Sequence, residues 1–127
     1  MKVQKLSLVY FKNHTDLSLE MEEVTAIAGL NGVGKTSVLD AIHFLCLGKS
    51  YFSSTDIQCI QSDQLQSGIL AEVENLSQFD LKIKLKRGSR KIIEKDNIPY
   101  KNISEHIGQF LAVVIAPNDI ALIYGTN

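Results

Sequence analysis

The sequence of 127 residues contains only two cysteines and two prolines, no tryptophan and no long apolar run. Cys46 and Cys59 stand far apart and form no CxxC pair, so we expect buried free thiols in a reducing cytosol. No apolar stretch approaches the roughly 20 residues that a membrane helix requires, and the first residues lack the apolar core of a signal peptide. These absences favour a cytoplasmic protein without a membrane partner.

An excess of positive charge is also missing. Thirteen Lys and Arg residues oppose fourteen Asp and Glu residues, which gives a formal net charge of -1. Any contact with DNA must therefore come from a local basic patch or from segments outside this chain. Hydrophobic residues make up 45% of the sequence and charged residues 21%, the balance of an ordinary globular protein, and the length suits a single domain over residues 1–127.

The first half of the chain shows two strand patterns, an apolar run and one helix pattern. Alternation predicts strands over residues 2–11 and 17–21, joined by a polar turn over residues 12–16 in which His14 is a polar turn residue. Residues 24–28 are mostly apolar and end at a glycine, which is typical of a strand buried on both faces. Over residues 35–47 apolar side chains, among them Val38, Leu39 and Ile42, recur at helical spacing, and Gly48 follows at a C-cap position.

The second half reads as a small β-rich region. Residues 49–67 form an irregular connection with room for a short helix, and strands over 69–74, 79–86 and 91–95 form an antiparallel meander with a turn at Gly88 and Ser89. Leu81, Ile83 and Leu85 form the core face of the second of these strands. A short helix is expected over residues 104–109, and a buried strand over 111–116 ends at Pro117. The whole predicts a mixed α/β fold.

One motif carries specific chemistry, the pattern G-x-x-x-x-G-K-[ST] of a phosphate-binding loop. It is matched in full by Gly29, Leu30, Asn31, Gly32, Val33, Gly34, Lys35 and Thr36. The loop follows a predicted buried strand and opens an amphipathic helix, and this context disfavours the alternative of a glycine-rich turn that contains Lys and Thr by chance. The motif therefore predicts nucleotide binding, and by itself it does not distinguish ATP from GTP.

Each residue type in the loop has a physical reason. The glycines let the backbone approach phosphate oxygens, and the N–H groups from Gly32 to Thr36 form an anion nest at the positive end of the helix dipole. We expect Lys35 to bridge the β- and γ-phosphates and to act as the catalytic cation. We expect the Thr36 hydroxyl to ligate Mg²⁺ and Ser37 to add a hydrogen bond to the α-phosphate.

The central Asn-Gly of the loop and the strand that ends in Phe11-Lys12-Asn13-His14 resemble the ABC-type ATPases of the SMC, Rad50 and RecF group. Further stretches resemble the RecF family in particular, and they are residues 40–45, 48–52, 85–88, 111–120 and 122–127. The resemblance covers essentially the whole chain but only the first third of a family member. Asn118 is a departure, since the family more often has an acidic or other residue there.

The resemblance implies a fold, cofactors and partners. The fold is the first lobe of an ABC-type ATPase head, a P-loop NTPase unit with an antiparallel β subdomain, and the cofactors are ATP and Mg²⁺. In the family the turn after the first strand lies over the nucleotide, so Lys12 and Asn13 are candidates for phosphate or base contacts, with a solvated turn as the alternative. The implied partners are DNA (duplex, gapped or with a single-strand junction), RecO/RecR-type mediators and a second copy in an ATP-dependent homodimer clamp.

The chain ends before the double arginine, the signature motif and the Walker B carboxylates that the family uses for turnover. We therefore expect this chain alone to bind ATP without hydrolysing it, whereas the full-length dimer is an ATPase by resemblance. A head of another SMC- or Rad50-like ATPase is the open alternative, and heptad repeats downstream would identify it. An ABC transporter subunit is less favoured, because residues 116–119 lack the glutamine of a Q-loop.

A basic stretch allows two interpretations. Its members are Lys82, Lys84 and Lys86 on one face of a predicted strand, followed by Arg87, Arg90, Lys91 and Lys95. Such a face binds DNA phosphates without reading sequence, or it is a solvated strand face whose lysines prevent edge pairing. His43 and His106 have no partner at metal-ligand spacing, so we predict no protein metal site at either histidine.

Overall fold

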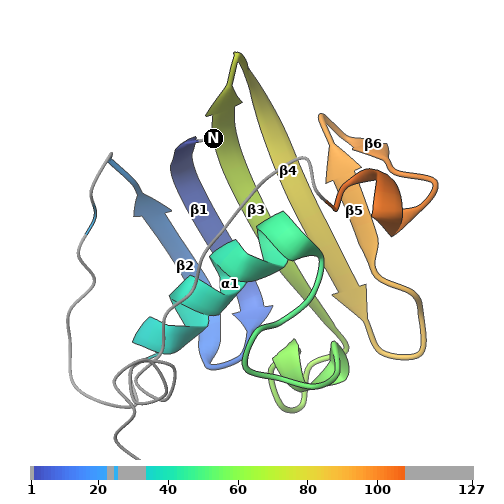
Figure 1. Ribbon diagram of the computed structural model, residues 1–127. Coiled ribbons are helices and arrows are strands. Elements are labelled where there is room, and N and C mark those ends of the chain that lie inside the picture. The colour runs from blue at the N-terminus through green and yellow to red at the C-terminus, as the bar shows by residue number, and fades with distance from the viewer. Residues whose placement is uncertain (1, 23–24, 26–33, 108–127) are drawn as a thin grey trace, which may run out of the picture.

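The computed structural model describes residues 2–22, 25 and 34–107, and its main element is one antiparallel sheet (Figure 1). A single α-helix and two short 3-10 helices complete the described part of the chain. In chain order the elements are β1 (Lys2–Phe11), β2 (His14–Glu20), α1 (Lys35–Leu47), η1 (Ile57–Cys59), β3 (Gln66–Asn75), β4 (Ser77–Lys86), β5 (Ile92–Lys95), β6 (Ile98–Pro99) and η2 (Ile103–Glu105).

The sheet has six strands in the order β2-β1-β3-β4-β5-β6, and every neighbouring pair is antiparallel. The N-terminal hairpin and the later meander, whose pairing with each other the sequence leaves open, are parts of this one sheet. They are joined because β3 pairs along β1, from Lys2 opposite Glu74 to Val9 opposite Gly68. The strand pairing therefore brings residues from the two ends of the described chain onto a common surface.

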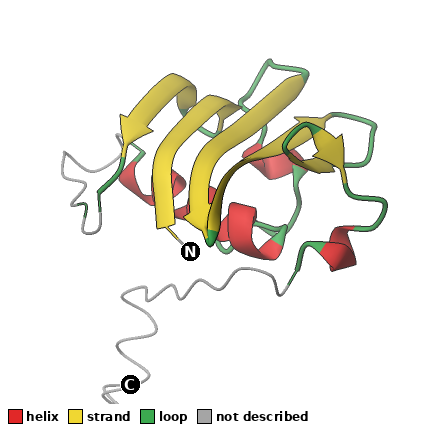
Figure 2. Ribbon diagram, turned by 90° about the horizontal axis from the view of Figure 1, so that it is seen from above, coloured by secondary structure: helices red, strands yellow, loops and turns green. Residues whose placement is uncertain are grey.

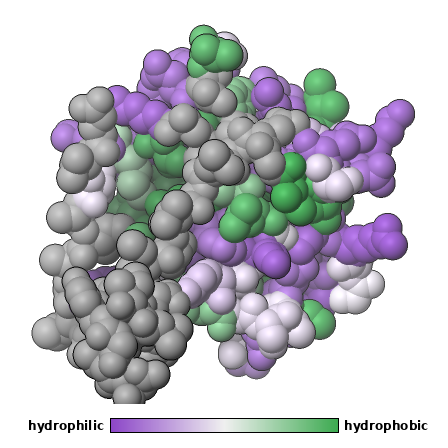
Figure 3. Space-filling view, in the orientation of Figure 1, coloured by the Kyte–Doolittle hydropathy of each residue, from purple (hydrophilic) through white to green (hydrophobic). Residues whose placement is uncertain are grey.

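The core lies between the sheet and α1, which crosses one face of the sheet (Figures 1 and 2). Alternation along the strands directs one set of side chains toward the helix, and Leu81, Ile83 and Leu85 of β4 are only 0–2% exposed, as predicted. Burial of such side chains against the helix is the main favourable term in folding. On the α1 side, hydrophobic groups show among a largely hydrophilic described surface (Figure 3).

Helix α1 has the bounds that the sequence predicts. It runs from Lys35 to Leu47 between the caps Gly34 and Gly48, both in the left-handed conformation, and the Gly48 N–H donates to the Phe44 carbonyl over 2.8 Å. Val38 is buried as its spacing suggests, whereas Leu39 is 50% exposed. His106, after η2, is fully buried and donates from Nε2 to the Leu45 carbonyl, which ties the end of the described chain to the helix.

Several boundaries differ from the prediction. Strand β2 begins at His14 rather than at residue 17, because Phe11 pairs with His14 and leaves a two-residue turn. Strand β3 begins at Gln66, so the irregular connection is shorter than expected, and η1 is its short helix. Strand β6 is two residues long and shows no pattern that predicts it. It follows a tight turn in which Asp96 and Asn97 have φ of 51° and 65°, a conformation that these residue types tolerate.

Other predictions are confirmed or lie outside the described residues. Gly88, with φ 78°, forms the expected turn after β4, and Cys46 and Cys59 are buried and free. The predicted strands over residues 24–28 and 111–116, loop residues 29–33 and Asn118 fall outside the described part. None of the helices described is both long enough and apolar enough to cross a membrane.

Candidate functional site

The N-terminal end of α1 carries the part of the predicted phosphate loop that the structure describes. Gly34, with φ 90° and ψ 23°, is the N-cap and makes no side-chain cap hydrogen bond, and the first turn of the helix has no acidic residue. Lys35 is half-buried and Thr36 is exposed. The leading N–H groups of a helix carry partial positive charge, and no carboxylate of the first turn offsets it here. This end of α1 is suited to an anion.

The turn between β1 and β2 packs directly on this helix end. His14 Nε2 donates to the Gly34 carbonyl over 2.8 Å, and Ser37 Oγ donates to Asn13 Oδ1 over 3.1 Å. A Cβ atom on Gly34 would lie 2.5 Å from His14 Nε2 and 2.6 Å from Asn13 Oδ1. Glycine is thus required at position 34 for two reasons, the positive φ and the close approach of the turn.

Lys12 of the same turn reaches the middle of α1. Its Nζ lies 2.6 Å from Asp40 Oδ2, and the two side chains are 16% and 0% exposed. Ser50 Oγ donates to the same carboxylate oxygen over 2.5 Å, and the Tyr51 N–H donates to Asp40 Oδ1 over 2.7 Å. One buried carboxylate therefore joins the β1–β2 turn, the helix and the segment that follows the helix.

The charge state of Asp40 follows from these contacts. Burial raises the pKa of Asp40, but the hydrogen bonds from Lys12, Ser50 and the Tyr51 backbone, together with the charge of Lys12, outweigh burial and leave the pKa below its ordinary value. Asp40 is therefore ionised at neutral pH, and its negative charge balances the charge of Lys12.

The Phe52 ring lies beside Lys12 of this ion pair and is the first of a row of three rings. The Phe52 ring centre is 5.8 Å from Lys12 Nζ, and the Tyr51 ring meets the Phe52 ring edge-on with centroids 4.8 Å apart. The other side of Tyr51 meets the His43 ring at 5.4 Å, while His43 Nδ1 donates to the Lys49 carbonyl over 2.8 Å. Rings in this position reduce the access of water to Lys12 and strengthen its attraction to Asp40.

The structure brings four predicted site residues into one contact group, namely Lys12, Asn13, Gly34 and Ser37, with Lys35 and Thr36 between them in the chain. The phosphate and Mg²⁺ roles of Lys35, Thr36 and Ser37 stay predictions. The Lys12 ammonium faces Asp40, so its direct contact with a phosphate or a base also stays a prediction. Gly29, Leu30, Asn31, Gly32 and Val33 lie outside the described residues.

Sequence reasoning missed two members of the group. His14, interpreted as a polar turn residue, is the donor that holds Gly34. Asp40 received no role, although an acidic residue among the apolar positions of a helix is a signal, since a buried charge requires a partner. Its partner, Lys12, is 28 residues earlier in the sequence, and no local pattern links the two.

The basic stretch is divided between the two faces of the sheet. Lys91 pairs with Asp56 over 3.0 Å, and Lys95 lies 4.6 Å above the Phe79 ring. Arg87 donates from Nε to the Gln64 carbonyl over 2.7 Å. The alternative of edge protection is wrong, because β4 is paired on both sides. Within the described chain, no group of three or more His, Cys, Asp or Glu residues gathers as metal ligands would.

Comparison with known proteins places this chain in a family. The chain matches the family model described as an AAA domain over residues 5–123. It is 42% identical to the DNA replication and repair protein RecF of Cytophaga hutchinsonii over its whole length, and 36% identical to RecF of Flavobacterium johnsoniae over 97% of its length. The chain spans about a third of these relatives, 34% and 35% of their lengths.

Solved structures agree with the sequence comparison. The recombination mediator RecF with ATP matches 96% of this chain and 34% of that protein, with a TM-score of 0.87 and 27% identity. An SMC ATPase, from work on ATP-driven dimerization and DNA-stimulated activation, matches 96% of this chain and 90% of that protein, with a TM-score of 0.79 and 18% identity, which shows the fold alone. The predicted fold class, the first lobe of a P-loop ATPase head, and the predicted resemblance to RecF are both confirmed. The chain belongs to the AAA domain family.

Proposed function

We propose that this chain is the ATP-binding part of a RecF-like DNA replication and repair protein. The observation that carries the proposal is the contact of the β1–β2 turn with the α1 N-terminus, through His14 to Gly34 and Asn13 to Ser37. These contacts hold the Gly34-Lys35-Thr36 end of the phosphate loop in one position relative to the sheet. The similarity to RecF solved with ATP supports the same assignment.

The described residues fit a nucleoside triphosphate and Mg²⁺. Gly34 has no room for a side chain, and the first turn of α1 contains no acidic group that would repel phosphate. Bound ATP supplies a terminal phosphoryl group that can be transferred to water. Lys35 would neutralise phosphate charge, the exposed Thr36 hydroxyl would ligate Mg²⁺, and the Asn13 contact keeps Ser37 oriented beside them. Lys12, paired with Asp40, would position the turn.

The wider proposal concerns the full-length protein. A second copy would close over the bound ATP with its signature motif, and the dimer would clamp duplex DNA near a single-strand gap, in the cytoplasm, with RecO/RecR-type mediators as partners. The relatives from Cytophaga hutchinsonii and Flavobacterium johnsoniae are DNA replication and repair proteins, which supports this role over that of a transporter subunit. A head of another SMC-like ATPase has support from the fold alone.

The test is ATP turnover by a protein of the relatives' full length that carries this segment. Turnover is measured without DNA and with single-stranded, duplex and gapped DNA, for the parent, for Lys35→Ala and for the exposed control Lys101→Ala. We expect DNA that contains duplex to raise turnover, Lys35→Ala to abolish it and Lys101→Ala to leave it unchanged. If none of these DNA forms changes the rate of turnover while ATP still binds, the repair assignment is overturned.

A further inference from the structure

The sheet face opposite α1 contains a groove that the proposed function does not use. It runs over β3 between β1 and β4 and has a volume of about 620 Å³, in the range of pockets that hold small ligands. Three aliphatic side chains in its lining are strongly exposed for their type: Val9 at 38%, Leu70 at 36% and Ile92 at 44%. Solvent contact with apolar side chains that line a hollow is a property of binding surfaces.

Gly68 makes this hollow possible. It lies in the middle of the sheet, opposite Val9 on one side and Lys84 on the other. A Cβ atom there would meet only the Ile83 carbonyl and Leu70 Cδ1, both at 3.8 Å, and Gly68 is not among the positive-φ glycines. The fold would accept a larger residue at this position. Glycine in a strand interior weakens the strand and often marks a bulge, a bend or a site where a ligand or another backbone approaches closely.

The charges around the groove are separated along the strands. Lys82, Lys84 and Lys86 line the groove along β4, and Lys86, the last residue of β4, lies with Arg90 at one end. Lys84 Nζ lies 3.3 Å from Glu94 Oε1, and Lys82 donates to Asn97 over 3.4 Å, whereas Lys86 and Arg90 form no ion pair with the described part of the chain. The unbalanced positive charge is therefore confined to this end.

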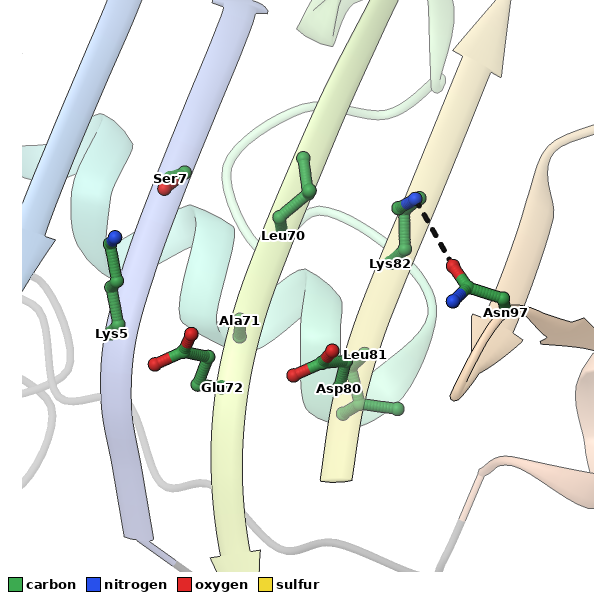
Figure 4. Close-up of a pocket in the computed structure, with 9 residues that line it drawn as sticks. All are labelled: Lys5, Ser7, Leu70, Ala71, Glu72, Asp80, Leu81, Lys82 and Asn97. Atoms are coloured by element: carbon green, nitrogen blue, oxygen red, sulfur yellow. Dashed lines mark hydrogen bonds between the residues drawn. The ribbon is translucent and has the colours of Figure 1, made fainter. Parts of the chain in front are cut away.

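The neighbouring end of the same face is mixed in charge. Figure 4 shows Glu72 and Asp80 beside Ala71 and Leu81, with Lys5 on β1 and Lys82 on β4 flanking them. Leu70 and Lys82 line both hollows, so the two are continuous. Duplex DNA carries about one negative charge for every 1.7 Å of its axis, and a duplex along this face would meet the carboxylates as well as the lysines. A short acidic segment that stays within the basic end avoids them.

We propose that this groove binds a short acidic peptide segment of a partner protein. An apolar side chain of the segment occupies the space above Gly68 between Val9, Leu70 and Ile92, and carboxylates on either side of it reach Lys86 and Arg90. The apolar lining favours a peptide over a single nucleic-acid strand, which is held chiefly by aromatic stacking, and Tyr10 is the one aromatic residue in the described lining. The groove lies on the opposite sheet face from Lys35, so the inference goes beyond the proposed function.

The test uses the 127-residue chain and a short fluorescein-labelled peptide of aspartates around a central leucine, with binding followed by fluorescence anisotropy. Gly68→Val fills the floor of the groove, and Lys86→Glu combined with Arg90→Glu reverses its basic rim. Lys5→Glu is the matched control, because it reverses a charge on the same face outside this groove. We expect saturable binding that each of the first two changes weakens by about tenfold or more, and that Lys5→Glu and Lys35→Ala leave within about twofold.

Far-UV circular dichroism confirms that each variant is folded, and the double charge reversal does not depend on how Gly68→Val packs. Three results would overturn the proposal. They are the absence of saturable peptide binding, equal binding by all variants, and preferential binding of single-stranded or duplex oligonucleotides that Gly68→Val reduces. Lys35→Ala separates this inference from the proposed function, since it removes nucleotide binding and retains peptide binding.

Discussion

Among single changes near the candidate site, removal of the Asp40 carboxylate has the largest expected effect on the free energy of unfolding. Asp40 is 0% exposed and receives hydrogen bonds from Lys12, Ser50 and the Tyr51 backbone at 2.5–2.7 Å. Deleting one partner of a buried ion pair destabilises a protein by about 3–5 kcal/mol, because the other charge stays buried without compensation. Since a domain has only about 5–15 kcal/mol of stability, Asp40→Ala should remove a large fraction of it.

A double-mutant cycle isolates the ion pair. Lys12→Met, Asp40→Ala and the double variant are compared with Lys84→Ala, Glu94→Ala and their double variant, in which the side chains of the parent pair are 52% and 11% exposed. We expect a coupling free energy of about 2 kcal/mol or more for Lys12 with Asp40, and of about 0–1 kcal/mol for the more exposed pair. Urea unfolding followed by far-UV circular dichroism measures both, since the chain has no tryptophan to report by fluorescence.

The Lys12 and Asp40 variants should also weaken nucleotide binding, although Asp40 is not expected to touch the nucleotide. Without Asp40, Lys12 no longer fixes the turn that presents Asn13 and His14 to the helix end. A coupling for Lys12 with Asp40 no greater than that of Lys84 with Glu94 would refute the reasoning.

Gly34, His106 and Cys46 supply three further predictions. Gly34→Ala should destabilise the chain by about 2 kcal/mol or more and abolish nucleotide binding, because alanine is strained at a φ of 90° and its Cβ would meet His14 and Asn13. The control is Gly88→Ala, at a φ of 78° with open space around the added Cβ. It should show only the backbone strain, about 1 kcal/mol in urea unfolding. Burial lowers the pKa of His106 from 6.5 more than its hydrogen bond to Leu45 raises it, so the unfolded chain takes up a proton more readily and the free energy of unfolding should fall as the pH drops below about 6.5. The lowered pKa of Asp40 should cause a second fall in the free energy of unfolding below about pH 4. His106→Gln should remove the fall near about pH 6.5 and leave the fall near about pH 4. Burial raises the pKa of Cys46 to about 11, so this thiol should stay unmodified by a thiol reagent at pH 8 until urea unfolds the chain, and rapid modification in the folded state would contradict its burial.

Local periodicity was sufficient to predict the elements with strong patterns. The bounds of β1 and α1 match the prediction, because both show a regular apolar repeat and α1 ends at a glycine that fits a C-cap. The alternation in β4 likewise identified Leu81, Ile83 and Leu85 as core. Strand β6 was missed because two residues are too few to show a period.

Interactions between distant segments were not predictable in this way. The pairing of β3 with β1 depends on pairing partners about 60 to 70 residues apart, and neither strand carries a mark of its neighbour. The link of His14 to Gly34 and the ion pair of Lys12 with Asp40 depend on how the hairpin packs over α1. Residue types alone predict Lys35 and Thr36 as site residues, since their motif is contiguous. The residues that contact this end of the loop are scattered along the chain.

The most direct test of the central claim is the response of individual backbone amides to ATP and Mg²⁺ in NMR spectra of this chain. We expect the largest shifts at Gly34, Lys35, Thr36 and Ser37, followed by Asn13 and His14, and we expect Lys35→Ala to remove them. Shifts concentrated instead at Gly68 and its neighbours on the opposite sheet face, or shifts that persist in Lys35→Ala, would contradict a nucleotide site at the beginning of α1.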